Sequence, residues 1–519
     1  MASLVVLVVQ APATVRQLYR SGDAAVAFVL PQLAGLSHAT AIDLGNHSWY
    51  EAWWFMRTTV DLPGHLVLWE AAPFVVALAG IASIVWSAWV ATGPRSALYT
   101  AVGLLAIGDA ARTVLFVPTA RVGMLLHLGV LCLALLIVWE RARTDSLSRR
   151  WLVILGAVLA CFTAAGATDQ LLIFDGLVPF CVASLAWWLR VRSKAAATLA
   201  LFTIATAVVS VIGSLVLSRV MHNEGVTAAQ NLHSFQFVQP SALGASITGT
   251  LTGWTTLANG DFFGAQIGVA ALTAFVLGML SLLGLAASLR LVWRETRSWW
   301  TAPAGSRTDP ARGSRDLFLA FWGAAVCMTI ASYCLTSVGA GANNYRYLIA
   351  GWGAVGALIG LLASSRHGKT ATAICLAAFS LTILVQDLRH GVPPPQSPTY
   401  STTQAVQIER FVLAHGAKVG YAGYSDAENL TWASRFKIEA FPVWACPGRP
   451  DSVCKWWFAS INTWYVPRQA TKSFLITGSE TDEIAAPAAT FGPAISTATF
   501  GRFTVRIYGH DLAAQLLNY

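Results

Sequence analysis

Residues 18–70 read LYRSGDAAVAFVLPQLAGLSHATAIDLGNHSWYEAWWFMRTTVDLPGHLVLWE and separate a short apolar N-terminus from the first clear membrane span. Charged residues make up only 11% of the chain, yet this stretch gathers acids and histidines among large aromatic residues. Acids and aromatics in a long loop beside a membrane indicate a site at the bilayer surface. The alternative is an interfacial amphipathic segment with its aromatic belt. The residues concerned are Asp23, Asp43, His47, Glu51, Asp61, His65 and Glu70, with Trp49, Tyr50, Trp53 and Trp54.

The composition places the chain among membrane proteins. Of its 519 residues 55% are hydrophobic, and the mean hydropathy is +0.58. The chain contains many apolar runs whose length is close to the roughly 20 residues needed to cross a bilayer. We therefore expect a polytopic α-helical membrane protein. The net charge of +9 falls mainly in short loops, where it sets orientation, so no nucleic-acid binding is expected.

The apolar runs predict the membrane spans. The first eleven residues, MASLVVLVVQA, are too short to span and are interpreted as the remnant of a first span, which makes about eleven in all. Basic residues then fall in alternate loops, which predicts a cytoplasmic face. The opposite face receives the loops 18–70 and 221–264 and everything after Asp387. The remaining spans are expected at 71–92, 97–117, 122–139, 151–167, 171–189, 196–219, 265–289, 317–338, 346–364 and 370–387.

The composition changes after the last span, which divides the chain into a transmembrane domain, 1–390, and an extracytoplasmic domain, 391–519. Cys446 and Cys454 lie in the loop CPGRPDSVC of this tail, and their spacing indicates a disulfide in an oxidising compartment. Short β-like runs alternate with a helical run, which predicts a small α/β domain. The runs are Thr403–His415 for the helix and Lys418–Tyr421, Ser473–Ile476 and Phe503–Tyr508 for the strands.

Ionisable groups at the ends of spans indicate functional positions, because a charge near the bilayer interior costs free energy unless it has a function or an opposite charge beside it. Asp169 opens a span in GATDQLLIFDGLVPF, and Asp175 lies deeper in the same segment. Arg346, in GANNYRYLIAG, is flanked by Tyr345 and Tyr347 and suits a lipid phosphate. Ordinary snorkelling at the interface is the alternative for Arg346.

The loop 221–264 is rich in Gly, Ser, Thr and aromatics, which is typical of a re-entrant or surface helix that roofs a cavity. No HExxH, DxD or Cys/His cluster occurs on the predicted outer face, so the sequence requires no cofactor, and a divalent cation stays open. The candidate lining residues of the cavity are His47, Trp54, His222, His233, Asn259 and Asp261.

The segments LYRSGDAAVAFVLPQL, ATDQLLIFDGLVPF, NNYRYLIAG and VGYAGYSDAENLTWAS, in this layout, resemble the GT-C class of membrane glycosyltransferases, of the protein O-mannosyltransferase and aminoarabinose transferase kind (glycosyltransferase family 39-like). The resemblance implies a polyprenyl-phosphate sugar donor and an aspartate of the first loop, Asp23, as base on the acceptor hydroxyl. Alanines follow Asp23 where that family has a second acid, so Asp43 and Glu51 stay rivals.

The resemblance also implies that Arg346 holds the donor phosphate, and Tyr345, Tyr347 and Arg121 are further candidates for that site. Asp169 opens another span on the same face as Asp23, so one of the two would act as base while the other orients the acceptor or a cation. The expected function is sugar transfer to a cell-envelope glycan, lipid or protein on the outer face of the inner or plasma membrane. A non-catalytic binding protein or transporter for lipid-linked saccharide is the alternative, as is a degenerate transferase that acts as a partner. The sequence GxxxxGK[ST] of ATP-binding loops does not occur.

Overall fold

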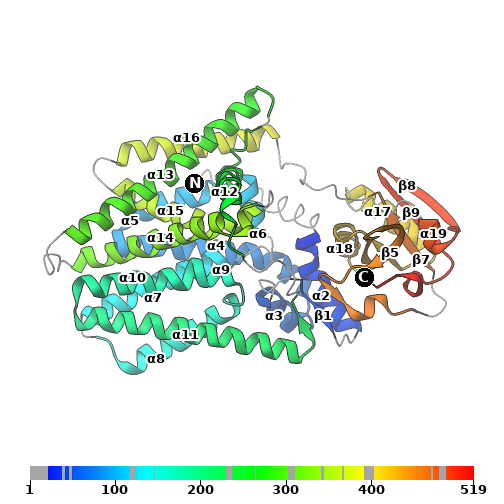
Figure 1. Cartoon of the computed structure of the whole chain (residues 1–519), viewed down its shortest axis with the longest axis horizontal. Coiled ribbons are helices and arrows are strands. Elements are labelled where there is room, and N and C mark those ends of the chain that lie inside the picture. The colour runs from blue at the N-terminus through cyan, green and yellow to red at the C-terminus, as the bar shows by residue number, and fades with distance from the viewer. Residues whose placement is uncertain are drawn as a thin grey trace.

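The computed structural model of the chain describes residues 22–37, 41–45, 50–116, 123–144, 146–228, 236–263, 265–301, 310–340, 344–364, 368–390, 402–468, 472–478 and 487–518. Figure 1 shows a bundle of long helices and a separate sheet domain from the C-terminal tail, with α2 (Gly22–Ser37), α3 (Tyr50–Thr59) and β1 (Ile42–Asp43) between them. The described elements α2, β1 and α3 of the loop 18–70 thus lie at the junction between the two parts.

Within these ranges nine helices are long and apolar enough to cross a membrane, so the chain has the helices of a multi-pass membrane protein. They match nine of the predicted spans. They are α4 (His65–Thr92), α7 (Met124–Arg143), α8 (Arg149–Gly166), α9 (Gln170–Leu172) continued by η2 (Ile173–Leu177) and α10 (Val178–Val191), α11 (Lys194–Asn223), α13 (Val269–Thr301), α14 (Pro310–Leu335), η5 (Asn344–Leu348) continued by α15 (Ile349–Ser364), and α16 (Lys369–His390). Residues 1–11, the predicted remnant of a first span, lie outside the described ranges.

Small residues let the central helices of the bundle approach closely. A Cβ placed on Gly80 of α4 would lie 2.8 Å from the backbone nitrogen of Leu126 in α7, and one on Gly129 of α7 would overlap the hydroxyl of Ser83. Backbones can come this close only where no side chain intervenes, and such contacts supply the van der Waals packing that holds helices together in lipid.

The segment 97–117, predicted as one span, is instead two shorter helices, α5 (Pro94–Leu105) and α6 (Asp109–Phe116). The break lies where the side chain of Asn259 fills the space beside Gly108. Its Oδ1 accepts a hydrogen bond from the backbone N–H of Ala110 at 3.1 Å. The amide therefore satisfies a backbone donor that the helix break exposes, as membrane interiors require.

Asn259 follows α12 (Leu243–Leu257), the main helix of the loop 221–264. The loop also holds β2 (Val226–Thr227) and η3 (Pro240–Ala242), and α12 packs on α13, α14, η4 (Ser337–Ala340) and η5. Gly260 rests directly on Gly278 of α13, about 13 Å along that helix from its start. The end of α12 therefore lies against the side of α13 and not beyond its end.

Two-residue strands tie three distant segments together. The strand β1 pairs in parallel with β2 and antiparallel with β6 (Ser460–Ile461), so Ile42 lies between Val226 and Ile461. These strands come from the loop 18–70, the loop 221–264 and the tail. The segments expected on one side of the membrane therefore meet in one small sheet.

The tail carries a six-stranded mixed sheet in the order β5-β4-β3-β7-β9-β8. Its predicted helix and three predicted strands are present as α17, β3, β7 and β9, and Cys446 and Cys454 are joined in a disulfide. The elements of the tail are α17 (Thr402–Ala414), β3 (Val419–Ala422), α18 (Tyr424–Ala433), β4 (Glu439–Cys446), β5 (Arg449–Lys455), η6 (Asn462–Tyr465), β7 (Ser473–Thr477), α19 (Pro487–Phe491), β8 (Ser496–Phe500), β9 (Phe503–Tyr508) and η7 (Leu512–Gln515).

The helix α2 is buried between the bundle and the tail. Its apolar side chains, from Ala25 to Leu33, belong to one hydrophobic core with aromatic residues of the tail. The ring of Phe28 stacks on that of Trp432 in α18, with centroids 4.5 Å apart. Nearby, the guanidinium of Arg435 pairs with the carboxylate of Glu70 at 2.7 Å. Apolar burial and this ion pair fasten the tail to the first loop.

A carboxyl group is also buried in the tail. Glu428 of α18 has no exposed surface, and no described residue donates a hydrogen bond to either carboxyl oxygen. Burial raises the pKa of Glu428 well above its ordinary value, because the ionised form loses its hydration. Glu428 therefore keeps its proton in the folded state over a range where the unfolded chain is ionised.

The stacking of Phe28 on Trp432 predicts how the tail is held. We expect Phe28→Ala to weaken the attachment by roughly 3–5 kcal/mol, the usual cost of removing a buried phenyl ring. Limited proteolysis of the full-length protein in detergent should then release the tail at lower temperature than in the parent. Ile495→Ala, which truncates a 58% exposed side chain of the tail, is the control and should behave like the parent.

The buried Glu428 predicts a pH dependence of stability. Because its folded-state pKa is raised, the unfolded state loses the proton first, and stability falls as pH rises above about 4.3, by at most about 1.4 kcal/mol per pH unit. Glu428→Gln should remove this slope between pH 5 and pH 8 in thermal unfolding of the full chain. Glu409→Gln, which alters a carboxylate paired with Lys437, should leave the slope in place. An equal slope in the Glu428→Gln protein would contradict the assignment.

Candidate functional site

A cleft of about 420 Å³ opens where the first loop meets the end of α11. We call it the loop cleft. It combines a guanidinium, an imidazole, a phenol and hydroxyls, the groups that bind and orient phosphates and sugars. Its lining residues are Tyr50, Leu215, Ser218, Arg219, His222, Thr227 and Ala228.

The small sheet places Asp43 beside this cleft. Asp43 is directly opposite Thr227 in the pairing of β1 with β2, and its Oδ1 accepts a hydrogen bond from the backbone N–H of Gly45 at 2.6 Å. Burial raises the pKa of Tyr50, and the negative charge of Asp43 raises it further. Asp43 is half-buried, and its strand partner Thr227 and its electrostatic partner Tyr50 both line the loop cleft.

The neighbour of Tyr50 takes part in a second arrangement. Oε1 of Glu51 lies 3.2 Å from Nε2 of His127 in α7, and the side chains are 44% and 2% exposed. The ring of His127 also packs on Phe162. Burial raises the pKa of Glu51, but the charge of His127 and the hydrogen bond lower it by more, and the net pKa is below its ordinary value. The pair couples the loop helix α3 to the bundle.

Asp169 lies at the same end of the bundle as this pair. Gly166, three residues earlier, packs against the ring of His127, since a Cβ there would lie 2.6 Å from Nε2. Asp169 is buried, and its Oδ1 accepts a hydrogen bond from the N–H of Leu171 at 3.1 Å, which caps α9. The carboxylate of Asp169 thus satisfies a backbone N–H group at the start of the helix. Asp175, fully buried, lies within the π-helical turn η2.

The predicted phosphate site is in another part of the bundle. The guanidinium of Arg346 lies over the ring of Tyr347, 5.4 Å from its centroid, and Tyr345 packs against Gly253 of α12. The turn η5, which carries these residues, contacts α12, α14 and α15, whereas the loop cleft is lined from α3, α11 and β2 and the residue that follows it.

The other predicted residues divide into two groups. Asp23 lies in the first turn of α2, but its side chain is outside the described part of the structure, as are Arg121, His47 and His233 as whole residues. Trp54 is half-buried on α3, and Asp261 is exposed after α12. Asn259 does not line the loop cleft, because its side chain accepts a hydrogen bond from the backbone of Ala110 at the break between α5 and α6.

Tyr50 and His222 of the loop cleft were named from the sequence, whereas Arg219, Thr227 and His127 were missed. Arg219 could have been found, because it lies at the end of a span that the charge pattern assigns to the acidic, outer face. His127, within the apolar run MLLHLGVLC, is an ionisable group inside a span and carries the same kind of signal. Thr227 has no such signal, since its place depends on the pairing of β1 with β2. No group of three or more His, Cys, Asp or Glu within the described ranges could hold a metal ion.

The pair of Glu51 and His127 predicts a stability effect that depends on pH. Because the folded-state pKa of Glu51 is lowered, its contribution is fully present above about pH 4.3 and is lost as pH falls through the lower folded value. We expect Glu51→Gln to cost about 1 kcal/mol at pH 7, a large value for a partly exposed pair, and less at pH 3.5. Thermal unfolding in detergent measures both. Glu140→Gln, which breaks an exposed pair with Arg143, is the control, and an equal effect of the two variants would contradict the prediction.

No protein-family model, curated protein or solved structure matches this chain.

Proposed function

We propose that the protein is a multi-pass membrane glycosyltransferase that moves a sugar from a polyprenyl-phosphate donor to an acceptor hydroxyl in the loop cleft. The observation that carries the proposal is the pairing of β1 with β2, which sets the carboxylate of Asp43 beside a cleft that contains Arg219 and His222. Such a transfer needs a base for the acceptor hydroxyl and a cationic partner for the leaving phosphate.

The reaction assigns a role to each group. The acceptor oxygen forms a bond to the anomeric carbon of the sugar while its proton passes to Asp43. The bond between the anomeric carbon and the phosphate oxygen breaks, and the lipid phosphate leaves with the electron pair. Arg219 balances the charge that develops on this phosphate, because a guanidinium can donate two parallel hydrogen bonds to it. His222 and Tyr50 position the sugar.

The remaining parts of the proposal rest on the charge pattern and on the resemblance. In this proposal the chain has eleven spans and a GT-C architecture and lies in the inner or plasma membrane, with its tail on the extracytoplasmic side. The acceptor is a glycan, a lipid or a protein. The disulfide between Cys446 and Cys454 supports an oxidising compartment for the tail. Arg346 then serves as an anchor at the other part of the bundle or as a second contact for the donor.

The test is transfer in vitro from a panel of polyprenyl-phosphate sugars by the purified full-length protein. Asp43→Asn keeps size and hydrogen bonding but removes basicity, so transfer should fall by about 10²–10⁴-fold, as is typical when a general base is lost. Arg219→Lys should already reduce transfer, because the forked donor geometry is lost. Asp61→Asn, which alters an exposed carboxylate of the same loop, is the control and should keep full activity.

The same assay separates Asp43 from its rivals. Asp23→Asn, Glu51→Gln and Asp169→Asn should retain more activity than Asp43→Asn. Full activity of the Asp43→Asn protein together with loss in Asp23→Asn would move the role of base to Asp23, as the resemblance implies. If the parent transfers no sugar from any donor, the transferase proposal fails.

A second candidate function is transport of a lipid-linked saccharide. The helix break between α5 and α6, bound by Asn259 from the end of α12, favours it, since discontinuous helices within the membrane are typical of transporters. Movement of a labelled lipid-linked saccharide across proteoliposomes by the parent, without transfer, would support this candidate.

A further inference from the structure

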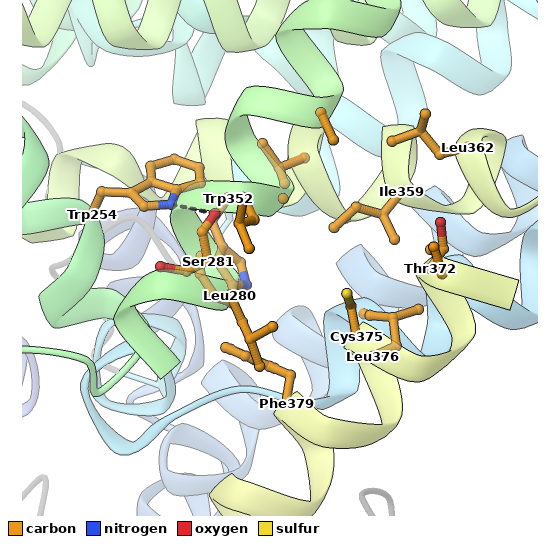
Figure 2. A pocket seen from close by; sticks show the side chains of 17 residues that line it. Trp254, Leu280, Ser281, Trp352, Ile359, Leu362, Thr372, Cys375, Leu376 and Phe379 are labelled. Atoms are coloured by element: carbon orange, nitrogen blue, oxygen red, sulfur yellow. Dashed lines mark hydrogen bonds between the residues drawn. The ribbon is translucent and has the colours of Figure 1, made fainter. Parts of the chain in front are cut away.

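An apolar cavity of about 300 Å³ lies between the helices of the bundle, away from the loop cleft. Its walls come from α5, α12, α13, α15 and α16. In Figure 2 the side chains of Thr372, Cys375 and Phe379 from α16 face Trp254 and Ser281 across the cavity. The indole of Trp254 donates a hydrogen bond to the carbonyl of Ser281 at 3.3 Å. The indole N–H of Trp254 is therefore already hydrogen-bonded, and the surface that lines the cavity is mainly hydrocarbon.

The cavity opens sideways onto the surface that would face lipid. Leu283, one of its lining residues, is 60% exposed, and Cys375 is also exposed. The helices that carry them, α13 and α16, are among the least buried of the candidate spans. A hydrocarbon chain of the bilayer can therefore enter without crossing a polar surface, and the cavity volume is at the lower end of the about 300–1,000 Å³ usual for ligand sites.

The depth of the cavity follows from its helices. The helix α16 contributes residues from its first turns, and α15 contributes residues from Trp352, near its start, to Leu362, near its end. Both belong to the end of the bundle where α4 gives way to α5 and α15 to α16, opposite the small sheet of β1, β2 and β6. The cavity thus extends along the bundle and reaches the end that carries the basic connecting loops.

Two of the helices that line the cavity, α5 and α16, carry a basic residue at that end. A Cβ on Gly103 of α5 would lie 3.7 Å from Cδ2 of Leu376 in α16, and both residues line the cavity. From this contact Arg95 is about 12 Å and Lys369 about 10 Å back along their helices, so the two residues start from a similar level. Both residues are exposed, and each lies in the first turn of its helix, where the helix dipole also favours an anion.

We infer that this cavity binds one acyl chain of an anionic phospholipid from the leaflet at the basic end of the bundle, with its phosphate between Arg95 and Lys369. The apolar walls select a hydrocarbon chain, and the two cations at the mouth select a negative head group over a zwitterionic one. The inference does not depend on the proposed transfer reaction, because it concerns other helices and the opposite end of the bundle.

Photolabelling of the full-length protein in phosphatidylcholine nanodiscs tests the inference. A trace of phosphatidylglycerol or of phosphatidylcholine carries the same diazirine acyl chain, and the labelled peptides are identified by mass spectrometry. Phosphatidylglycerol should label peptides of α13, α15 and α16 more strongly, and the preference should fall roughly fivefold for each of Arg95→Gln and Lys369→Gln. Arg150→Gln, which removes an exposed basic residue of α8 at the same end, should keep the preference.

Filling the cavity tests the chain site separately. Gly284→Leu directs a side chain toward Ile359 and Val355 of the opposite wall, and Ala371→Phe fills the cavity from α16. Either variant should lose most of the labelling by both lipids, whereas Ile374→Phe, at a 64% exposed position of α16 outside the lining, should keep it. Equal labelling by the two lipids in the parent, or labelling that survives in both filled variants, would overturn the inference.

Discussion

The burial of α2 is the constraint on which the junction between the bundle and the tail depends. A helix that is apolar around most of its circumference must be covered on every side, and neither the bundle nor the tail covers α2 alone. Phe28 therefore packs on Trp432 of the tail, while other side chains of α2 join the core formed with α3. Because β1 follows α2 closely along the chain, this packing also determines where Asp43 can lie.

Hydrogen bonding then refines the position that apolar burial sets. The backbone N–H of Ile42 donates to the carbonyl of Gly225 at 2.9 Å, and that of Asn462 donates to the carbonyl of Ala41 at 3.0 Å. Two-residue strands contribute little stability by themselves, but they fix the register between segments that apolar contacts have already brought together. That register puts Asp43 opposite Thr227, which lines the loop cleft together with Arg219 and His222.

The bundle obeys a different constraint, since lipid offers no hydrogen bonds to an interrupted backbone. The break between α5 and α6 is tolerated because Asn259 supplies an acceptor at the N-terminus of α6. Close glycine contacts, such as that of Gly260 with Gly278, bring the end of α12 to this depth. The sequence alone would assign Asn259 to a surface loop, but its side chain hydrogen-bonds to the backbone of α6 inside the bundle.

The sequence by itself determined the membrane class, nine of the spans, the strand and helix runs of the tail and the pairing of Cys446 with Cys454, because each follows from local hydropathy, periodicity or spacing. It did not locate the loop cleft. Arg219, Tyr50 and Thr227 belong to segments far apart in the chain, and only the packing of α2 against the tail and the register of β1 with β2 bring them together. For Asp169 the sequence predicts the position, at the entrance of a span, but not the role. Its carboxylate caps α9, and that contact depends on the backbone geometry of the folded chain. Contacts between distant segments depend on tertiary burial, and no local pattern encodes them.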